Sequence, residues 1–186
     1  MPGNWGRQHY DDCALMAVAD IVGELTGTKP SEDDVIALAT CTPNSLGSGP
    51  IYSLPGDPHI ATDVVRKDQL PIIKDLPILL AHFGVHSFHT DDAIAAGGGP
   101  ATGIAALAGY LAEGRKVIVS LNGETIWDIP GDRTVHDHDV VVIVVDTAAG
   151  VVHLNDSATL HGDNQVSAAR FEIAWKTSNH AMVVAG

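Results

Sequence analysis

Apolar positions recur at helix spacing at the start of the chain. Between residues 14 and 25 they fall on one face of a helix, which Asp11 or Asp12 is suited to cap and Gly27 to end. The pattern therefore predicts an amphipathic helix that begins next to Cys13, after a polar and glycine-containing lead-in.

Further helices are indicated along the chain. Ser31 and Asp34 have the spacing of a capping box, so a short helix is expected to start there. Apolar residues at helix spacing predict two more helices, over 72–83 and 104–111, and a glycine follows each of them. Ser167 is suited to cap a last, short helix.

Strand patterns dominate the second half of the chain. Short runs of β-branched and other apolar residues predict strands, and a turn at 147–150 would join two of them as a hairpin. The expected strands cover 85–90, 116–121, 139–146, 151–155 and 180–185. Helices that cluster early and strands that cluster late are typical of an α+β fold with an antiparallel sheet.

The length of 186 residues and the 45% of hydrophobic residues favour one domain with a substantial core. We expect a single domain over 1–186, with a helical part at about 1–113 and a sheet part at about 114–186. The segment 41–68 is rich in proline and glycine and lacks periodicity. We interpret it as an excursion that borders a cleft, and the polar loop 122–135 as a second wall of that cleft.

The charge balance excludes two classes of partner. The net charge is −13, from 10 basic and 23 acidic residues. Nucleic acid and anionic membrane surfaces both require clustered Lys and Arg, so we expect neither as a partner. An acidic, solubilising surface is the simplest interpretation.

The chain carries no pattern of a membrane protein or a cleaved signal peptide. Residues 1–12 are polar, and the longest apolar run covers only 140–145. The default expectation is a cytoplasmic protein. Export without a cleaved signal, or origin as a fragment of a larger secreted protein, would give the same pattern.

Cys13 is the first candidate for chemistry. It would stand at the start of a helix, where the macrodipole and free N–H groups favour a thiolate. Gln8 lies five residues before it and could act as a side-chain amide donor to an oxyanion. Asp11 and Asp12 oppose the thiolate, so an imidazolium would have to outweigh them. The other cysteine, Cys41, leaves one disulfide with Cys13 as an alternative.

A base and an orienting group are available at the far end of the chain. His138 stands where a polar loop enters the strongest predicted strand, and His136 would share its side-chain direction if the strand began early. The predicted hairpin brings its two ends together, so Asp156 could accept a hydrogen bond from the imidazole of His138. Asn155 is the competing orienter.

A metal site is the rival hypothesis for the histidines. It would use His82, His86 and His89, or the run 136–139. Neither set places its ligands at tight zinc spacing on one face of one element, so we expect no metal and no cofactor.

The order of these blocks resembles that of the papain-like bacteriocin-processing cysteine peptidases, the double-glycine leader peptidases and their stand-alone relatives. The resemblance lies in Gln8 and Cys13 before a helix, in the run from His138 to Asp146, and in Asn155–Asp156. It implies a papain-like α+β fold with Cys13 as nucleophile, His138 as general base, Asp156 as orienter and Gln8 as oxyanion donor.

The chain also departs from that family. Ala14 follows the cysteine where the family often has Gly, and Ser157 follows Asp156 where the family often has Pro. The resemblance implies a cysteine peptidase acting on a peptide or protein substrate. The alternatives are a catalytically inactive papain-like module that binds a peptide or protein partner, and the same triad used for amide or transpeptidation chemistry.

Overall fold

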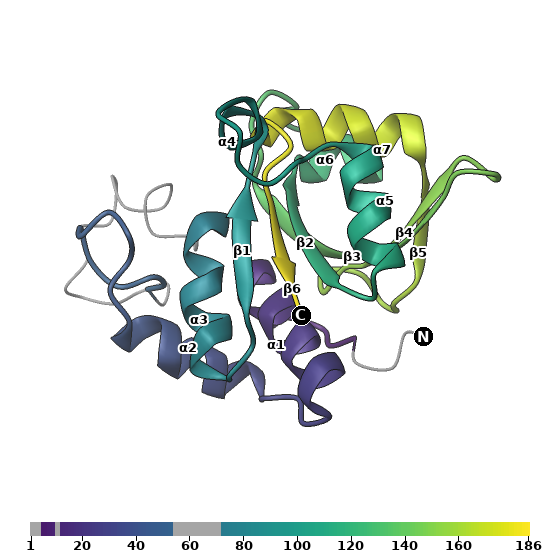
Figure 1. Ribbon diagram of the computed structural model, residues 1–186. Helices are drawn as coiled ribbons and strands as arrows, with labels where there is room; N and C mark the ends of the chain where they lie inside the picture. Colours follow the sequence, from purple (N-terminus) through teal and green to yellow (C-terminus); the bar gives the residue numbers. More distant parts are fainter. Residues whose placement is uncertain (1–4, 10–11, 54–71) are drawn as a thin grey trace.

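The protein folds as helices packed on both faces of a six-stranded antiparallel sheet (Figure 1). The computed structural model describes residues 5–9, 12–53 and 72–186. The helices are α1 (Cys13–Thr26), α2 (Glu32–Cys41), α3 (Leu76–His82), α4 (Asp92–Ala96), α5 (Ile104–Ala112), α6 (Gly123–Trp127) and α7 (Ala168–Trp175), with 3₁₀ turns η1 (Ile73–Asp75) and η2 (Lys176–Ser178). The strands are β1 (Ser87–Thr90), β2 (Lys116–Leu121), β3 (His138–Asp146), β4 (Val151–Asn155), β5 (Asn164–Ser167) and β6 (Met182–Ala185).

The sheet has the strand order β1-β6-β2-β3-β4-β5, and every neighbouring pair is antiparallel. β3 and β4 form the predicted hairpin, with a register shift between Val142 and Val144. The predicted α+β fold with an antiparallel sheet is thus confirmed. β1 lies within the predicted strand 85–90 and pairs with the closing strand β6, so the part of the chain before residue 114 also contributes a strand to the sheet.

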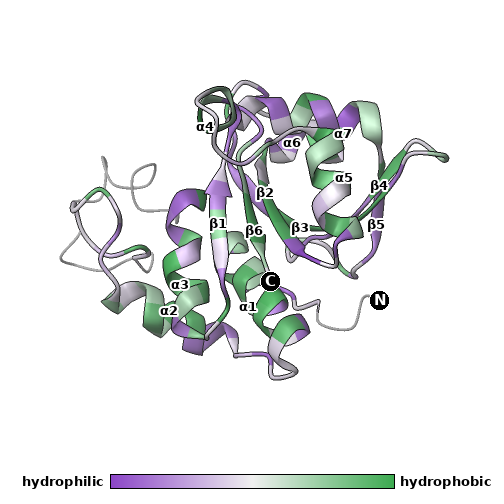
Figure 2. Ribbon diagram, in the orientation of Figure 1, coloured by the Kyte–Doolittle hydropathy of each residue, from purple (hydrophilic) through white to green (hydrophobic). Residues whose placement is uncertain are grey.

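Alternation along the strands divides the core into two layers. Successive side chains of a strand point to opposite faces, so Ile118, Val141 and Val183 pack against α1, α2 and α3. Their neighbours Val117 and Val140 face the other way, where α5, α6 and α7 cover the sheet. Figure 2 shows the strands between these helices as mainly apolar.

The ends of the first two helices follow local rules. Ser31 and Asp34 form the predicted capping box at the start of α2, and Gly27 ends α1 in the left-handed conformation with φ 78°. Asp12 occupies the N-cap position of α1, but its side chain makes no capping hydrogen bond. Asp11 lies outside the described residues.

Several short elements differ from the predicted pattern. α4 and β5 were not expected, and α6 forms within the predicted loop 122–135, where Asn122 caps it through Thr125 N. Elements of four or five residues are too short to display a period in the sequence. Of the predicted excursion 41–68, residues 54–68 lie outside the described part of the chain.

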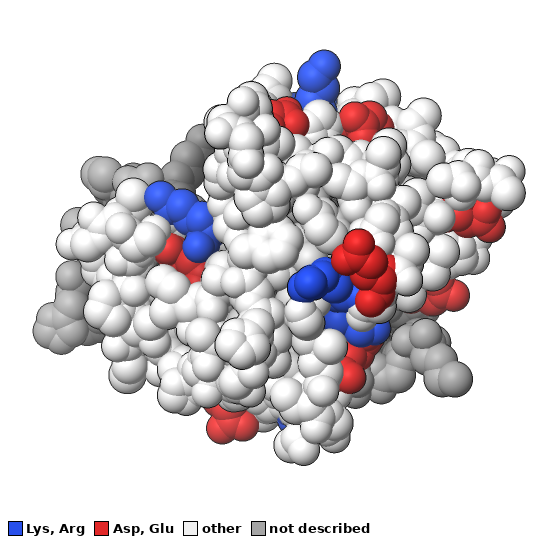
Figure 3. All heavy atoms as spheres, in the orientation of Figure 1, with Lys and Arg blue, Asp and Glu red and all other residues white. Residues whose placement is uncertain are grey.

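The described surface carries scattered charges. On the face in Figure 3, basic side chains lie in small groups with acidic ones nearby, and the described residues form no continuous basic area there. Within the described ranges, no helix combines the length and the apolar composition needed to span a bilayer.

A buried ion pair fixes the position of α1. Asp20 is 3% exposed on this helix and pairs with Lys29 in the segment that leads to α2. Burial raises the pKa of Asp20 to about 6, although Lys29 acts in the opposite direction. The position of α1, which carries Cys13, therefore depends on the pairing of the Asp20 carboxylate with Lys29.

Lys29→Met should leave the Asp20 carboxylate uncompensated. We expect a loss of about 3 kcal/mol in the free energy of unfolding at pH 8, and a much smaller loss at pH 5, where Asp20 is protonated. Lys116→Met is the matched control, because the Lys116–Glu24 pair also involves α1 but is more exposed than the Lys29–Asp20 pair. Urea unfolding at both pH values measures the effect. Equal losses for the two variants would contradict this role of Lys29.

Candidate active site

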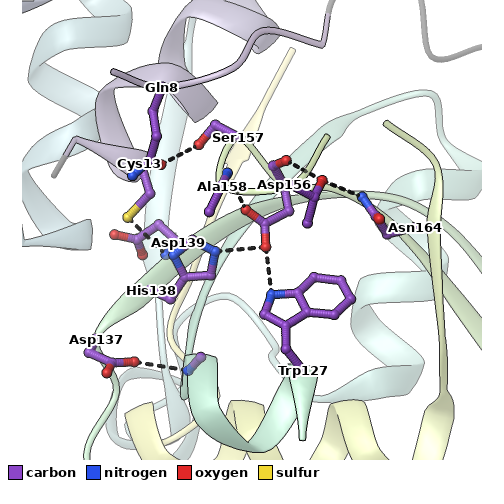
Figure 4. A network of polar contacts seen from close by, with 12 residues as sticks. Gln8, Cys13, Trp127, Asp137, His138, Asp139, Asp156, Ser157, Ala158 and Asn164 are labelled. Carbon is purple, nitrogen blue, oxygen red and sulfur yellow. Dashed lines mark hydrogen bonds and ion pairs between the residues drawn. The ribbon is translucent and has the colours of Figure 1, made fainter. Parts of the chain in front are cut away.

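A cleft of about 610 Å³ opens between the start of α1 and the sheet. The cleft is lined by residues from the lead-in to α1, from the first two positions of α1, from the segment before α3, and from β1, β2 and β3 at or near one end of each strand. Its lining residues are Gln8, Cys13, Ala14, Ile72, Ile73, Lys74, His89, Asp91, Ser120, His136, Asp137, His138, Asp139 and Ala181. Three of the four predicted site residues therefore line one cleft, and Asp156 lies behind His138 (Figure 4).

Cys13 is the first residue of α1 and packs against the start of β3. The backbone N–H of Asp139 donates a hydrogen bond to Cys13 Sγ over 3.4 Å. Cys13 and Cys41 are both free thiols, and Cys41 is exposed. The structure therefore contains no disulfide bond between Cys13 and Cys41.

His138 and Asp156 form a buried ion pair. His138 begins β3 and Asp156 directly follows β4, so the hairpin brings the two side chains together. His138 Nε2 and Asp156 Oδ2 are 2.8 Å apart, and the Asp156 side chain is fully buried. Nε2 has no partner in hydrogen-bonding geometry, so the contact is a close ion pair rather than an aligned hydrogen bond.

The environment of this pair favours its charged form. Burial lowers the pKa of His138, but the charge of Cys13 and the close contact with Asp156 raise it more, so it lies well above its ordinary value. Burial likewise raises the pKa of Asp156, and the contact with His138 outweighs this effect and leaves it below its ordinary value. Both shifts favour an imidazolium that faces a carboxylate.

Two further donors fix the carboxylate of Asp156. Trp127 Nε1 on α6 donates to Oδ2 over 2.7 Å, and the backbone N–H of Ala158 donates to Oδ1 over 2.8 Å. Sequence reasoning placed Trp127 in a loop and missed this contact. The only signal in the sequence was an isolated tryptophan in a polar segment, which does not identify its partner.

Gln8 is held by the residue that follows Asp156. Its backbone N–H donates to Ser157 O over 3.1 Å, and Ser157 Oγ donates to Gln8 Oε1 over 2.7 Å. The lead-in to α1 is thus tied to the turn after β4, and the Gln8 side chain lines the cleft with Cys13.

His136 and Asn155, the alternatives to His138 and Asp156, make other contacts. His136 lines the cleft, with Nδ1 3.4 Å from Thr177 O. Asn155 Oδ1 accepts a hydrogen bond from the backbone of Asp163. Within the part of the chain that the structure describes, the carboxylate paired with His138 is that of Asp156.

The rival histidine clusters do not converge. Across residues 5–9, 12–53 and 72–186, no three His, Cys, Asp or Glu side chains gather in a group that could hold a metal ion.

The acidic neighbours of Cys13 behave differently from the expectation drawn from sequence. Asp12 is fully buried, and burial followed by the charge of Glu32 raises its pKa to about 7. Asp139 is also buried, and burial raises its pKa to about 6 although Ser120 donates a hydrogen bond to its carboxylate. Both carboxyls therefore carry less negative charge near neutral pH than exposed aspartates would.

Asp156→Asn should lower the pKa of His138 by about one pH unit or more, because it removes the facing charge. NMR titration of the His138 ring resonances measures this. Asp163→Asn is the matched control, since it removes a carboxylate from the separate His153 pair. An unchanged titration of His138 in Asp156→Asn would contradict the assignment of the ion pair.

Asp12→Asn should change how stability depends on pH. Folded Asp12 keeps its proton up to about pH 7, whereas the unfolded carboxyl ionises near its ordinary value of 3.8, so the wild type loses stability as pH rises between these values. Asparagine cannot ionise, so the variant should gain roughly 4 kcal/mol over the wild type at pH 8 and almost nothing at pH 4. Urea unfolding across this range tests it, with exposed Asp33→Asn as control. A parallel pH dependence of variant and wild type would refute it.

The protein has close relatives in mycobacteria. Uncharacterized protein Rv1268c of Mycobacterium tuberculosis is 44% identical over 187 aligned positions, which cover 97% of this chain and 79% of that protein. Uncharacterized protein Mb1299c of Mycobacterium bovis matches with the same identity and coverage. No family model matches the chain.

Two solved structures share the fold. A crystal structure described as a C39-like peptidase from Bacillus anthracis superposes with a TM-score of 0.67 at 14% identity, covering 98% of this chain and 93% of that chain. A double glycine motif protease from an AMS/PCAT transporter, in complex with the leader peptide, superposes with a TM-score of 0.53 at 10% identity, covering 97% and 87%. The chain therefore belongs to the family of Rv1268c and Mb1299c, and its fold is that of the C39-like peptidases.

Proposed function

We propose that the protein is a cysteine peptidase that cleaves peptide bonds through Cys13, His138 and Asp156, with Gln8 as oxyanion donor. The observation that carries the proposal is the position of the His138 ring, which interacts with Cys13 on one side and with buried Asp156 on the other. Cys13 and His138 both line the cleft, so a bound peptide could reach them.

The electrostatics support a thiolate at Cys13. The raised pKa of His138 favours the protonated ring, and an adjacent imidazolium stabilises a thiolate. The start of α1 and the N–H of Asp139 act in the same direction, since both direct N–H dipoles to the sulfur.

The reaction then proceeds by acyl transfer. The Cys13 thiolate attacks the scissile carbonyl carbon, and the resulting oxyanion accepts hydrogen bonds from Cys13 N–H and the Gln8 amide. His138 gives its proton to the leaving amine, and the C–N bond breaks to leave a thioester on Cys13. Neutral His138 then takes a proton from water, which hydrolyses the thioester, releases the acid and restores the ion pair.

A peptide is the substrate class that the fold favours. The double glycine motif protease of similar fold was solved with a leader peptide. The cleft volume of about 610 Å³ is sufficient for several side chains of an extended peptide. The charge of −13 disfavours a nucleic acid in the same place.

The relative reactivity of the two thiols tests the proposal. Cys13 should react with iodoacetamide faster than exposed Cys41 at pH 6, because His138 lies next to Cys13 and its surroundings favour an imidazolium. His138→Ala should remove this advantage, and Cys41 should be unaffected. Mass spectrometry of the two alkylated peptides gives both rates from one sample.

Hydrolysis itself is measured on a mixture of peptides from a digested, denatured protein. The wild type should produce new peptide ends, and Cys13→Ala should produce none above background. Cys41→Ser is the matched control and should retain full activity. A Cys13 that reacts no faster than Cys41, together with equal product patterns for wild type and Cys13→Ala, would refute the peptidase and favour a binding module.

A further inference from the structure

The turn after β4 contacts both halves of the proposed machinery (Figure 4). Asp156 faces His138, and the next residue, Ser157, bonds to Gln8 through both backbone and side chain. Ser157 is 5% exposed, so water does not compete effectively for its hydroxyl. One dipeptide thus links the proposed base and the proposed oxyanion donor.

Gln8 depends on its contacts for its orientation. It lies in the irregular lead-in before α1, outside any helix or strand. A functional side chain on irregular backbone is not fixed by a rigid element and needs neighbouring bonds to hold its rotamer. The bond from Ser157 Oγ to Gln8 Oε1 is such a constraint, at 2.7 Å.

The chemistry requires one of the two amide orientations. Only the NH₂ end of a glutamine can donate to an oxyanion, whereas the carbonyl end would direct lone pairs at the negative charge. Ser157 engages Oε1, and this leaves the NH₂ end on the other side of the amide group. Gln8 and Cys13 line the same cleft.

We propose that Ser157 is a positioning residue: its hydroxyl fixes the Gln8 amide so that Nε2 donates to the oxyanion formed at Cys13. The inference rests on the proposed function. The resembled peptidases often have proline after the orienting aspartate, and proline has neither a hydroxyl nor a backbone N–H. Ser157 therefore supplies a bond that such a residue cannot.

Two reagents separate this role from a general structural one. p-Nitrophenyl acetate acylates Cys13 through a tetrahedral oxyanion: the thiolate attacks the carbonyl carbon, and p-nitrophenolate leaves. Iodoacetamide alkylates the same thiolate by displacement of iodide, with no oxyanion. Loss of the Gln8 donor should therefore slow acylation and leave alkylation unchanged. Both rates are measured in Cys41→Ser protein, where Cys13 is the remaining cysteine.

Ser157→Ala should lower the acylation rate about tenfold or more at an unchanged alkylation rate, and Ser157→Thr should restore it in part. Thr159→Ala is the matched control: it removes a hydroxyl from the same turn that bonds Asp156 O and His161 O, with no bond to Gln8. Gln8→Ala and the double variant Gln8→Ala/Ser157→Ala should show equal defects, because Ser157 acts through Gln8. Thermal unfolding checks that each variant is folded.

Two results would overturn the inference. One is a Ser157→Ala protein that acylates as fast as its parent, and the other is a double variant whose defect is the product of the two single defects. Failure of the proposed function gives a different result, in which the parent thiol reacts slowly with both reagents. In that case the Gln8 side-chain NH₂ signals in NMR decide: signals unchanged by Ser157→Ala would overturn the positioning role as well.

Discussion

The buried ion pair of His138 and Asp156 is the interaction on which the rest of the site depends. Removing a carboxylate from water costs several kcal/mol, and only well-placed partners offset that cost. Asp156 has them: His138 faces Oδ2, Trp127 donates to the same oxygen, and Ala158 donates to Oδ1. The start of β3, the short helix α6 and the turn after β4 therefore meet at one carboxylate. A shift of any of these three segments would remove a contact that stabilises the Asp156 carboxylate opposite His138.

The sheet brings these groups together through its register. Antiparallel pairing of β3 with β4 places the start of one strand beside the end of the other, so His138 and the residues after Asn155 become neighbours. Alternation along β3 then turns Val141 toward α1, and the packing of α1 on that face brings Cys13 against the N–H of Asp139. Cys13 and His138 thus stand on rigid elements, while Gln8 and Asp156 lie in irregular segments. Those segments are joined to each other by Ser157 and by the bond from Trp5 Nε1 to Asp156 O.

The sequence predicts the parts of this arrangement that have local causes. β2 was predicted with its observed bounds because its run of β-branched residues is continuous, and Ser31 and Ser167 cap α2 and α7 because capping depends on residues within one turn. Trp127 and Ser157 could not be found in this way. Their partners lie far away in the sequence, and a single tryptophan or serine has no periodicity that would indicate a contact. α6 was missed for a related reason, since one turn of helix does not complete a hydrophobic pattern.

Burial also weakens the expected effect of the acidic residues on Cys13. In the sequence, Asp12 next to Cys13 counts as a full negative charge that opposes a thiolate. In the fold, burial raises the pKa of Asp12 to about 7 and that of Asp139 to about 6, while the pKa of His138 lies well above its ordinary value. In mildly acidic to neutral solution, both carboxyls therefore carry less negative charge beside Cys13 than exposed aspartates would, while the surroundings of His138 favour its imidazolium form. The acidic residues beside Cys13 therefore oppose a negatively charged nucleophile less than their positions in the sequence suggest.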